Sequence, residues 1–137
     1  MAKPYRYLDH TADLGFEING KTLAELFVNT GRALFETQIN GTIKTENQKS
    51  MKLHGESLED LYLDWCRELL FAFSADGFIP AQYEVTIEDL RLAAILRGEH
   101  YDPTRHRIRM EIKNPTYHEL LIEQDEQGFH ARIIFDV

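Results

Sequence analysis

The spacing of apolar residues changes at Phe78, and this change constrains the fold more than any other feature of the sequence. Two segments before Phe78 carry apolar residues at intervals of three and four, which is the period of a helix with one buried face. Most segments after Phe78 alternate apolar and polar residues, which is the period of a half-buried strand. The helical stripes are Leu23, Leu26, Phe27, Thr30, Ala33 and Leu34, and then Leu58, Leu61, Tyr62, Trp65, Leu69 and Phe73. The sequence therefore predicts two amphipathic helices and a sheet that covers them.

Capping residues mark where both helices begin. Thr22 and Ser57 each precede an acidic residue by three positions, the spacing that caps a helix N-terminus. We expect the first helix to end near Gln38 and the second near Gly77. Strands are predicted on both sides of a polar corner within residues 1–20, and within 43–54, 83–88, 92–96, 108–112, 120–122 and 131–135.

These elements predict an α+β fold for the chain. Half-buried strands are typical of an antiparallel or mixed sheet with helices on one face. We therefore expect one domain over residues 1–137, a two-layer α/β sandwich with a mostly antiparallel or mixed sheet.

The charge of the chain argues against direct binding to nucleic acid. The formal net charge is −8, from 23 acidic and 15 basic side chains. Sequence-independent binding to phosphates needs clustered Lys and Arg, and the basic residues at 105–109 lie among acidic neighbours. We therefore expect a protein or cation partner, with RNA contacted only indirectly.

Two further features indicate where the protein functions. The sequence shows neither a signal peptide nor a run of about 18 apolar residues, so we expect a cytoplasmic protein with no membrane contact. Cys66 is the only cysteine, so no internal disulfide can form, and its place beside Trp65 in an apolar helical pattern predicts a buried thiol.

Two separate places in the sequence carry carboxylates that could bind a hard cation. Asp9, His10 and Asp13 lie in the polar corner near the start, and Asp136 and the α-carboxylate of Val137 lie at the end. Ca²⁺ and Mg²⁺ prefer oxygen ligands of this kind. The alternative is structural: the first group caps a turn through its own backbone, and the second is a polar tail.

A third candidate surface follows the strand predicted over 108–112. Pro115 follows Asn114 and interrupts the strand pattern, which leaves Lys113, Tyr117 and His118 near one bend. A lysine there could contact a phosphate or an acidic group of a partner. A solvated bend with no function is the alternative.

A self-contained catalytic site is not visible in the sequence. There is no glycine-rich phosphate loop, no HExxH motif and no cysteine pair for zinc. Ser57 and Ser74 have the positions of helix-end residues, and we expect His100 and His106 to be exposed on a polar loop. These absences predict a protein that is not an enzyme.

The chain resembles the archease family in several motifs, which occur in the same order from end to end. The motifs are Tyr7-Leu8-Asp9-His10-Thr11-Ala12-Asp13-Leu14-Gly15, Lys21-Thr22-Leu23, Gly98-Glu99 with Asp102 and His106, Lys113 with Thr116-Tyr117-His118, and Phe135-Asp136-Val137. The first motif, the Thr-Tyr-His segment and the acidic penultimate residue are specific in combination. Pro115 departs from the pattern, since many members have an aliphatic residue there.

The resemblance implies both a fold and a function. The family fold is a two-layer α/β sandwich. The implied function is that of a non-catalytic cofactor of the GTP-dependent RNA ligase of the RtcB type, acting in tRNA splicing and RNA repair. Such a cofactor promotes guanylylation of the ligase and its multiple turnover.

The resemblance also implies roles for particular residues. Asp13 and Asp136 would be metal ligands, with Val137 completing a site for Ca²⁺, or for Mg²⁺ or Mn²⁺. Lys113 matches a position that the family needs for activation. We group Asp9, His10, Tyr117 and His118 with Lys113 as residues that contact the partner.

Two other functions remain open from the sequence. One is a chaperone-like interaction module, in which the acidic corner is structural. The other is a metal-dependent hydrolase that acts alone, for which the sequence offers no nucleophile or base.

Overall fold

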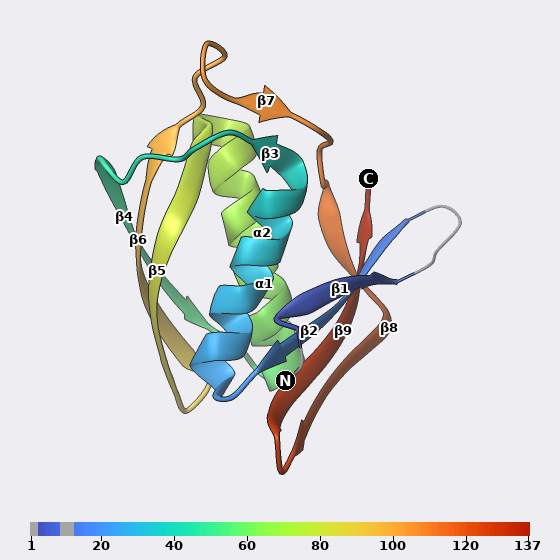
Figure 1. The fold of residues 1–137 in the computed structure, drawn as a ribbon. Coiled ribbons are helices and arrows are strands. Elements are labelled where there is room, and N and C mark those ends of the chain that lie inside the picture. The colour runs from blue at the N-terminus through green and yellow to red at the C-terminus, as the bar shows by residue number, and fades with distance from the viewer. Residues whose placement is uncertain (1–2, 9–12) are drawn as a thin grey trace.

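The computed structural model describes residues 3–8 and 13–137, in which two helices lie between two antiparallel sheets (Figure 1). The helices are α1 (Leu23–Gln38) and α2 (Leu58–Asp76). The strands are β1 (Tyr5–Leu8), β2 (Leu14–Gly20), β3 (Ile39–Asn40), β4 (Asn47–His54), β5 (Phe78–Glu88), β6 (Arg91–His100), β7 (Arg107–Ile108), β8 (Asn114–Asp125) and β9 (Gly128–Asp136). The α+β class predicted from the periodicity is confirmed.

The larger sheet joins the two ends of the chain. Its strand order is β1-β2-β9-β8, so β9 is a central strand between β2 and β8. The second sheet has the order β4-β6-β5, and β3 and β7 form a short pair. All pairings among the described residues are antiparallel.

The helix pair packs against both of the larger sheets. Helix α1 contacts β2 of the first sheet and β5 of the second, and α2 contacts β8 of the first and β4 and β5 of the second. Each of these sheets therefore has helices on one of its faces, whereas the sequence predicted a single sheet with helices on one face. The alternation of apolar and polar residues does not show that the strands divide between separate sheets.

Both predicted caps are present and fix the starts of the helices. The Thr22 Oγ1 accepts the Glu25 N–H at 3.1 Å, and the Ser57 Oγ accepts the Asp60 N–H at 3.1 Å. Helix α2 ends at Gly77, whose left-handed φ of 72° favours glycine. The predicted helix boundaries are confirmed at both ends.

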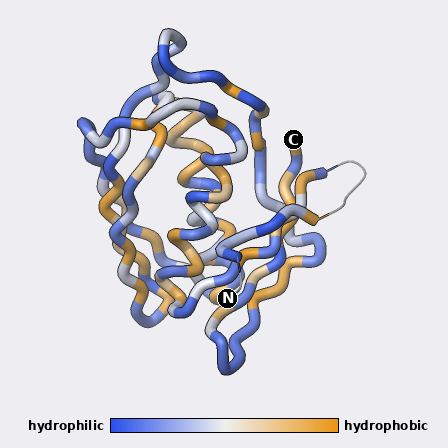
Figure 2. The backbone as a smooth tube through the Cα atoms, in the orientation of Figure 1, coloured by the Kyte–Doolittle hydropathy of each residue, from blue (hydrophilic) through white to orange (hydrophobic). Residues whose placement is uncertain are grey.

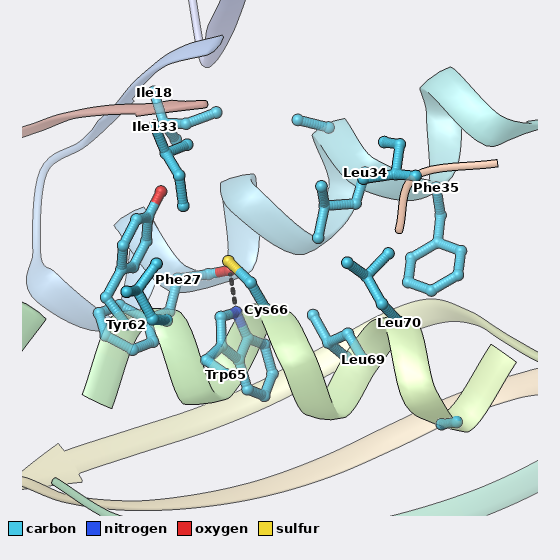
Figure 3. Packing of buried hydrophobic residues seen from close by; sticks show 14 of the residues in the cluster. Ile18, Phe27, Leu34, Phe35, Tyr62, Trp65, Cys66, Leu69, Leu70 and Ile133 are labelled. Carbon is cyan, nitrogen blue, oxygen red and sulfur yellow. Dashed lines mark hydrogen bonds between the residues drawn. The ribbon is translucent and has the colours of Figure 1, made fainter. Parts of the chain in front are cut away.

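The helices meet in a core that combines apolar packing with internal hydrogen bonds. The Trp65 Nε1–H donates to the Phe27 carbonyl at 2.9 Å and so links α2 to α1 (Figure 3). Tyr62 and Cys66 are fully buried beside them, which confirms the buried thiol. Burial raises the pKa of the Cys66 thiol well above its usual range. Hydrophilic residues dominate the hairpin tips and the connection that contains β7 (Figure 2).

Two predicted strands are shorter than expected. The strand predicted over 43–54 begins at Asn47, and that predicted over 108–112 is reduced to β7. In the second case the backbone bonds to the end of α1 instead of to a strand. The Arg109 N–H donates to the Gln38 carbonyl at 2.7 Å, and the Ile112 N–H donates to the Gln38 Oε1 at 2.9 Å.

Neither helix in the described ranges has the length and apolar character needed to cross a membrane.

Candidate functional site

The register of β2 and β9 brings the first and last acidic candidates to the same edge of the larger sheet. Leu14, the first residue of β2, lies opposite Phe135. Asp13 directly precedes Leu14, and Asp136 directly follows Phe135. The two aspartates are therefore neighbours across the strands, although 123 positions separate them in the sequence. We call Asp13, Asp136 and Val137 the acidic corner.

Strand alternation determines which way the acidic corner faces. Phe135 is fully buried and Leu14 packs against the same core, so this pair faces the helices. Successive residues of a strand point to opposite faces of the sheet. Asp13 and Asp136 consequently lie on the face directed away from the core, where Asp136 is exposed and Asp13 is partly exposed.

Lys113 lies directly before β8, at the edge of the larger sheet next to the acidic corner. Its N–H donates to the Asp136 carbonyl at 2.9 Å, and the next residue, Asn114, pairs with Asp136 in the register of β8 and β9. The Lys113 side chain is exposed, as is that of Asp136, and Val137 is 45% exposed. One edge of the sheet thus brings together a lysine and the carboxylates proposed from the sequence.

The acidic corner offers only carboxylate oxygens from its side chains and its terminal group. Two side-chain carboxylates and an α-carboxylate are ligands that suit Ca²⁺, Mg²⁺ or Mn²⁺. Within residues 3–8 and 13–137, no group of three or more His, Cys, Asp or Glu side chains has the arrangement of a metal site. Main-chain oxygens or residues beyond these ranges would have to complete the coordination. Asp9 and His10 lie outside the described residues.

Tyr117 and His118 lie in an irregular stretch of β8 that leads away from the acidic corner. Pairing with β9 is interrupted between Thr116 and Leu121, and Glu119 has a left-handed φ of 55°. The Tyr117 hydroxyl donates to the Asp60 Oδ1 at 2.6 Å, which ties the bulge to the first turn of α2. This bond raises the pKa of Tyr117, and His118 remains exposed beside Glu119. Tyr117 therefore links β8 to α2 and does not join Asp13 and Asp136.

A buried polar network beyond the C-terminal ends of α1 and α2 was not predicted. His106 is fully buried, so the expectation of an exposed histidine was wrong. Its Nδ1 accepts the Asp102 N–H at 2.9 Å, and its Nε2 lies 3.2 Å from the Glu99 Oε2. The Thr42 carbonyl lies 3.3 Å from the same Nε2.

Glu99 is the centre of this network. Arg105 pairs with both of its carboxylate oxygens, and the Lys44 N–H donates to the Oε2 at 2.6 Å. The hydrogen bonds from Arg105 are the main cause that lowers the pKa of Glu99 to about 2. The sequence had singled out Glu99 and Asp102 only as shared motif residues. Glu99 is buried and Asp102 stays partly exposed, and the signal for the burial of Glu99 was its place at the end of an apolar strand pattern.

The comparisons with known proteins agree with this fold along the whole chain. Residues 5–137 match the Archease protein family. "Protein archease" of Methanosarcina acetivorans is 35% identical, with 100% of this chain and 98% of the relative covered. "Protein archease" of Methanopyrus kandleri is 30% identical, with 98% of this chain and 99% of the relative covered.

Two solved structures resemble the chain in fold as well. The solution structure of Protein 1598 of Methanobacterium thermoautotrophicum has a TM-score of 0.85 at 28% identity, covering 98% of this chain and 99% of that one. The crystal structure of an archease, described as a possible chaperone, from Thermotoga maritima has a TM-score of 0.69 at 28% identity and covers 100% of this chain and 98% of that one. With a match over nearly its full length, the chain belongs to the archease family.

Proposed function

We propose that the protein is a non-catalytic, metal-binding cofactor that activates a GTP-dependent RNA ligase of the RtcB type. It would promote guanylylation of the ligase and its multiple turnover, in tRNA splicing and RNA repair in the cytoplasm. The observation that supports this proposal most is the pairing of β2 with β9, which makes Asp13 and Asp136 neighbours beside Lys113. The net charge of −8 also favours a protein partner over direct contact with RNA.

The acidic corner would hold the metal in this proposal. Asp13, Asp136 and the α-carboxylate of Val137 would bind a divalent cation, with Ca²⁺ the first candidate and Mg²⁺ or Mn²⁺ as alternatives. A bound cation supplies positive charge that can orient phosphate oxygens. Lys113 lies next to the site and would contact a phosphate or a carboxylate of the ligase.

The remaining candidates would belong to the surface that meets the ligase. Asp9 and His10 precede Asp13 in the sequence, and His118 is exposed on β8, the edge strand that directly follows Lys113. Tyr117 would act by holding the bulge of β8 on α2 through its bond to Asp60. These side chains would orient the partner and carry no chemistry of their own.

The roles of the candidate nucleophiles support a function without catalysis. The Ser57 hydroxyl caps α2, and the Ser74 hydroxyl donates to the Phe71 carbonyl at 3.3 Å. The Cys66 thiol is fully buried, and burial disfavours the reactive thiolate.

The direct test is a guanylylation assay of a cognate ligase with GTP and Mn²⁺. We expect the wild-type protein to raise the rate and allow repeated turnover, and Asp13→Ala to lose most of this stimulation. Asp76→Ala is the matched control, since Asp76 is an exposed aspartate at the end of α2, where it pairs with Lys49. Equal stimulation by the wild type and Asp13→Ala would overturn the role of the acidic corner.

A chaperone-like interaction module is the second candidate function. It is favoured by the description of the Thermotoga maritima archease as a possible chaperone. In this case the acidic corner would be structural, and neither Asp13→Ala nor Asp136→Ala would change ligase guanylylation. The same assay therefore separates the two functions.

A further inference from the structure

One face of α2 is turned to solvent and ends in an exposed aromatic ring. Asp60, Asp64, Arg67 and Phe71 follow one another at intervals of four, three and four residues, so they lie in one row along the helix. The last of them, Phe71, is 65% exposed, more than any other large apolar side chain among the described residues. The row lies on the side of α2 that borders β8, because the hydroxyl of Tyr117 bonds to Asp60.

The bulge of β8 places a second aromatic ring beside this row. In the pairing with β9, residues 117–120 lie opposite Ile133 alone, so they arch out of the strand. Tyr117 is 58% exposed although its hydroxyl is held by Asp60. The bond to Asp60 raises the pKa of Tyr117, and the charge of Arg67, which is also close, lowers it in part. We use the name α2 face for the surface formed by Asp60, Asp64, Arg67, Glu68, Phe71 and Tyr117.

The α2 face is acidic however its neighbours are counted. Helix α2 holds five carboxylates and one cation, Arg67, and so supplies half of the net charge of −8. Arg67 pairs with Asp64 at 3.0 Å, and Asp76 pairs with Lys49 at 3.9 Å. When both pairs are counted as neutral, three carboxylates are left, those of Glu59, Asp60 and Glu68. In the stretch that leads into the bulge, the basic residues are matched by acidic ones, Lys113 and His118 by Glu111 and Glu119.

Exposed aromatic rings among carboxylates favour an arginine-bearing partner. A guanidinium is attracted to the face of an aromatic ring and forms paired hydrogen bonds with a carboxylate. The rings of Phe71 and Tyr117 and the carboxylates of the α2 face can therefore bind the same kind of side chain. An apolar or acidic partner would instead bury these carboxylates without a counter-charge, which is unfavourable.

The dimensions of the α2 face suit a protein partner that also reaches the acidic corner. Asp60 and Phe71 are eleven residues apart, which is about 16 Å along a helix. Lys113, which lies beside the acidic corner, precedes Tyr117 by four residues, which is at most about 13 Å along a strand. One partner can consequently contact both surfaces at the same time.

We propose that the α2 face docks on a basic, arginine-bearing surface of the RNA ligase. This inference rests on the proposed function, because it takes the ligase as the partner. An enzyme that joins RNA ends needs Lys and Arg side chains for the phosphates of its substrate, and the acidic α2 face is complementary to such a surface. Phe71 would be the anchor of the contact, and Asp60, Asp64 and Glu68 would orient the ligase around it.

The test measures the Kd of the full-length protein for the cognate ligase at low and at high salt. We expect Phe71→Ala to raise the Kd by at least about tenfold. Glu68→Lys should also raise the Kd and should weaken its dependence on salt, because it removes an attraction that salt screens. The matched controls are Leu121→Ala, at a β8 side chain that is 46% exposed, and Glu126→Lys, in the exposed turn between β8 and β9. Both controls should bind like the wild type.

The maximal rate of guanylylation separates this inference from the proposed function. At saturating concentration, Phe71→Ala and Glu68→Lys should reach the wild-type rate, whereas Asp13→Ala should not. Both α2-face substitutions are at exposed positions, so the melting temperature should stay at the wild-type value.

Two results would overturn the docking surface and leave the role of the acidic corner intact. One is a wild-type Kd in both Phe71→Ala and Glu68→Lys. The other is a salt dependence in Glu68→Lys as steep as that of the wild type. If the wild-type protein neither bound nor stimulated the ligase, the proposed function would fail, and the docking surface with it.

Discussion

Glu99 is a buried carboxylate that stays ionised because its neighbours replace water as hydrogen-bond donors. Arg105 and the Lys44 N–H bond to its oxygens, and the His106 Nε2 lies within hydrogen-bonding distance of one of them. The carboxylate thereby joins the turn at 101–106 to the segment at 42–44, which are distant in sequence. A single side chain therefore holds together two loops that are otherwise joined by the short β3–β7 pair beside them.

Acid should destabilise the protein through Glu99. Its pKa is about 2 in the folded state against 4.5 for the unperturbed group, so the unfolded chain binds the proton more readily. The stabilisation is complete above about pH 5 and is lost as the pH falls toward 2, by an amount on the order of 3 kcal/mol. Urea unfolding monitored by Trp65 fluorescence across this pH range measures the loss.

The variant Glu99→Gln tests the assignment to this residue. We expect it to be less stable at neutral pH by about 2 to 3 kcal/mol, because Arg105 loses its buried charged partner and keeps only the more exposed Asp102. It should also lose most of the fall in stability below pH 5. Glu84→Gln is the control, since Glu84 is 62% exposed in its pair with Arg97 and should change stability little. An acid dependence as steep in Glu99→Gln as in the wild type would contradict the assignment.

The helices are joined by hydrogen bonds within an otherwise apolar interface. Thr30 Oγ1 of α1 donates to the Leu26 carbonyl at 2.8 Å and lies 2.8 Å from the Tyr62 hydroxyl of α2. Both side chains are buried, so Thr30 Oγ1 accepts the Tyr62 proton. This bond fixes how α2 lies along α1, which apolar packing alone determines less strictly.

A double-mutant cycle should show this coupling between the helices. We expect Thr30→Val to cost about 1 to 3 kcal/mol, because the Tyr62 hydroxyl is then buried without a partner. Thr30→Val/Tyr62→Phe should be less destabilised than the sum of the two single changes, since both polar groups are then gone. Urea denaturation of the four proteins gives the coupling energy. Strictly additive values would mean that the hydroxyls do not interact.

The helices were the part of the fold that the sequence predicted best, because their signals are local. Thr22 and Ser57 cap by bonding three residues ahead, and the apolar stripes lie within each helix. The strand predicted over 108–112 was overpredicted beyond Ile108, because the main-chain carbonyl and the side chain of Gln38 accept the N–H groups of Arg109 and Ile112. The division of the strands into two sheets was missed for the same reason, since pairing depends on partners far away in sequence.

Across the whole molecule, residues from both ends of the chain meet in the acidic corner. Their adjacency was expected from the resemblance to a family, and nothing in the local pattern of Asp13 or Asp136 implies it. His106 shows the opposite case, because a polar loop pattern predicted exposure and burial came from residues more than 60 positions away. The local sequence therefore identified candidate site residues, but it did not predict which distant residues lie beside them or whether they are buried.

Metal binding at the acidic corner should stabilise the whole fold. A cation that binds only the folded protein adds about 2.7 kcal/mol at a concentration of 100 times its Kd. We expect Ca²⁺ to raise the melting temperature of the wild type and a chelator to reverse the rise. Calorimetry of Asp13→Ala and Asp136→Ala should show neither effect, with Asp76→Ala behaving like the wild type. A rise of equal size in the aspartate variants would place the cation elsewhere.

The central position of β9 has a consequence for how the protein is made. On the ribosome, β1 and β2 emerge first, but the neighbour that β2 needs is synthesised only when residues 128–136 are added. The edge of β2 that pairs with β9 therefore stays unpaired while more than 100 residues are translated. Helices α1 and α2 can form and pack on the β4-β6-β5 sheet during this interval. The larger sheet, and with it the acidic corner, then closes in a late step after β9 has left the ribosome.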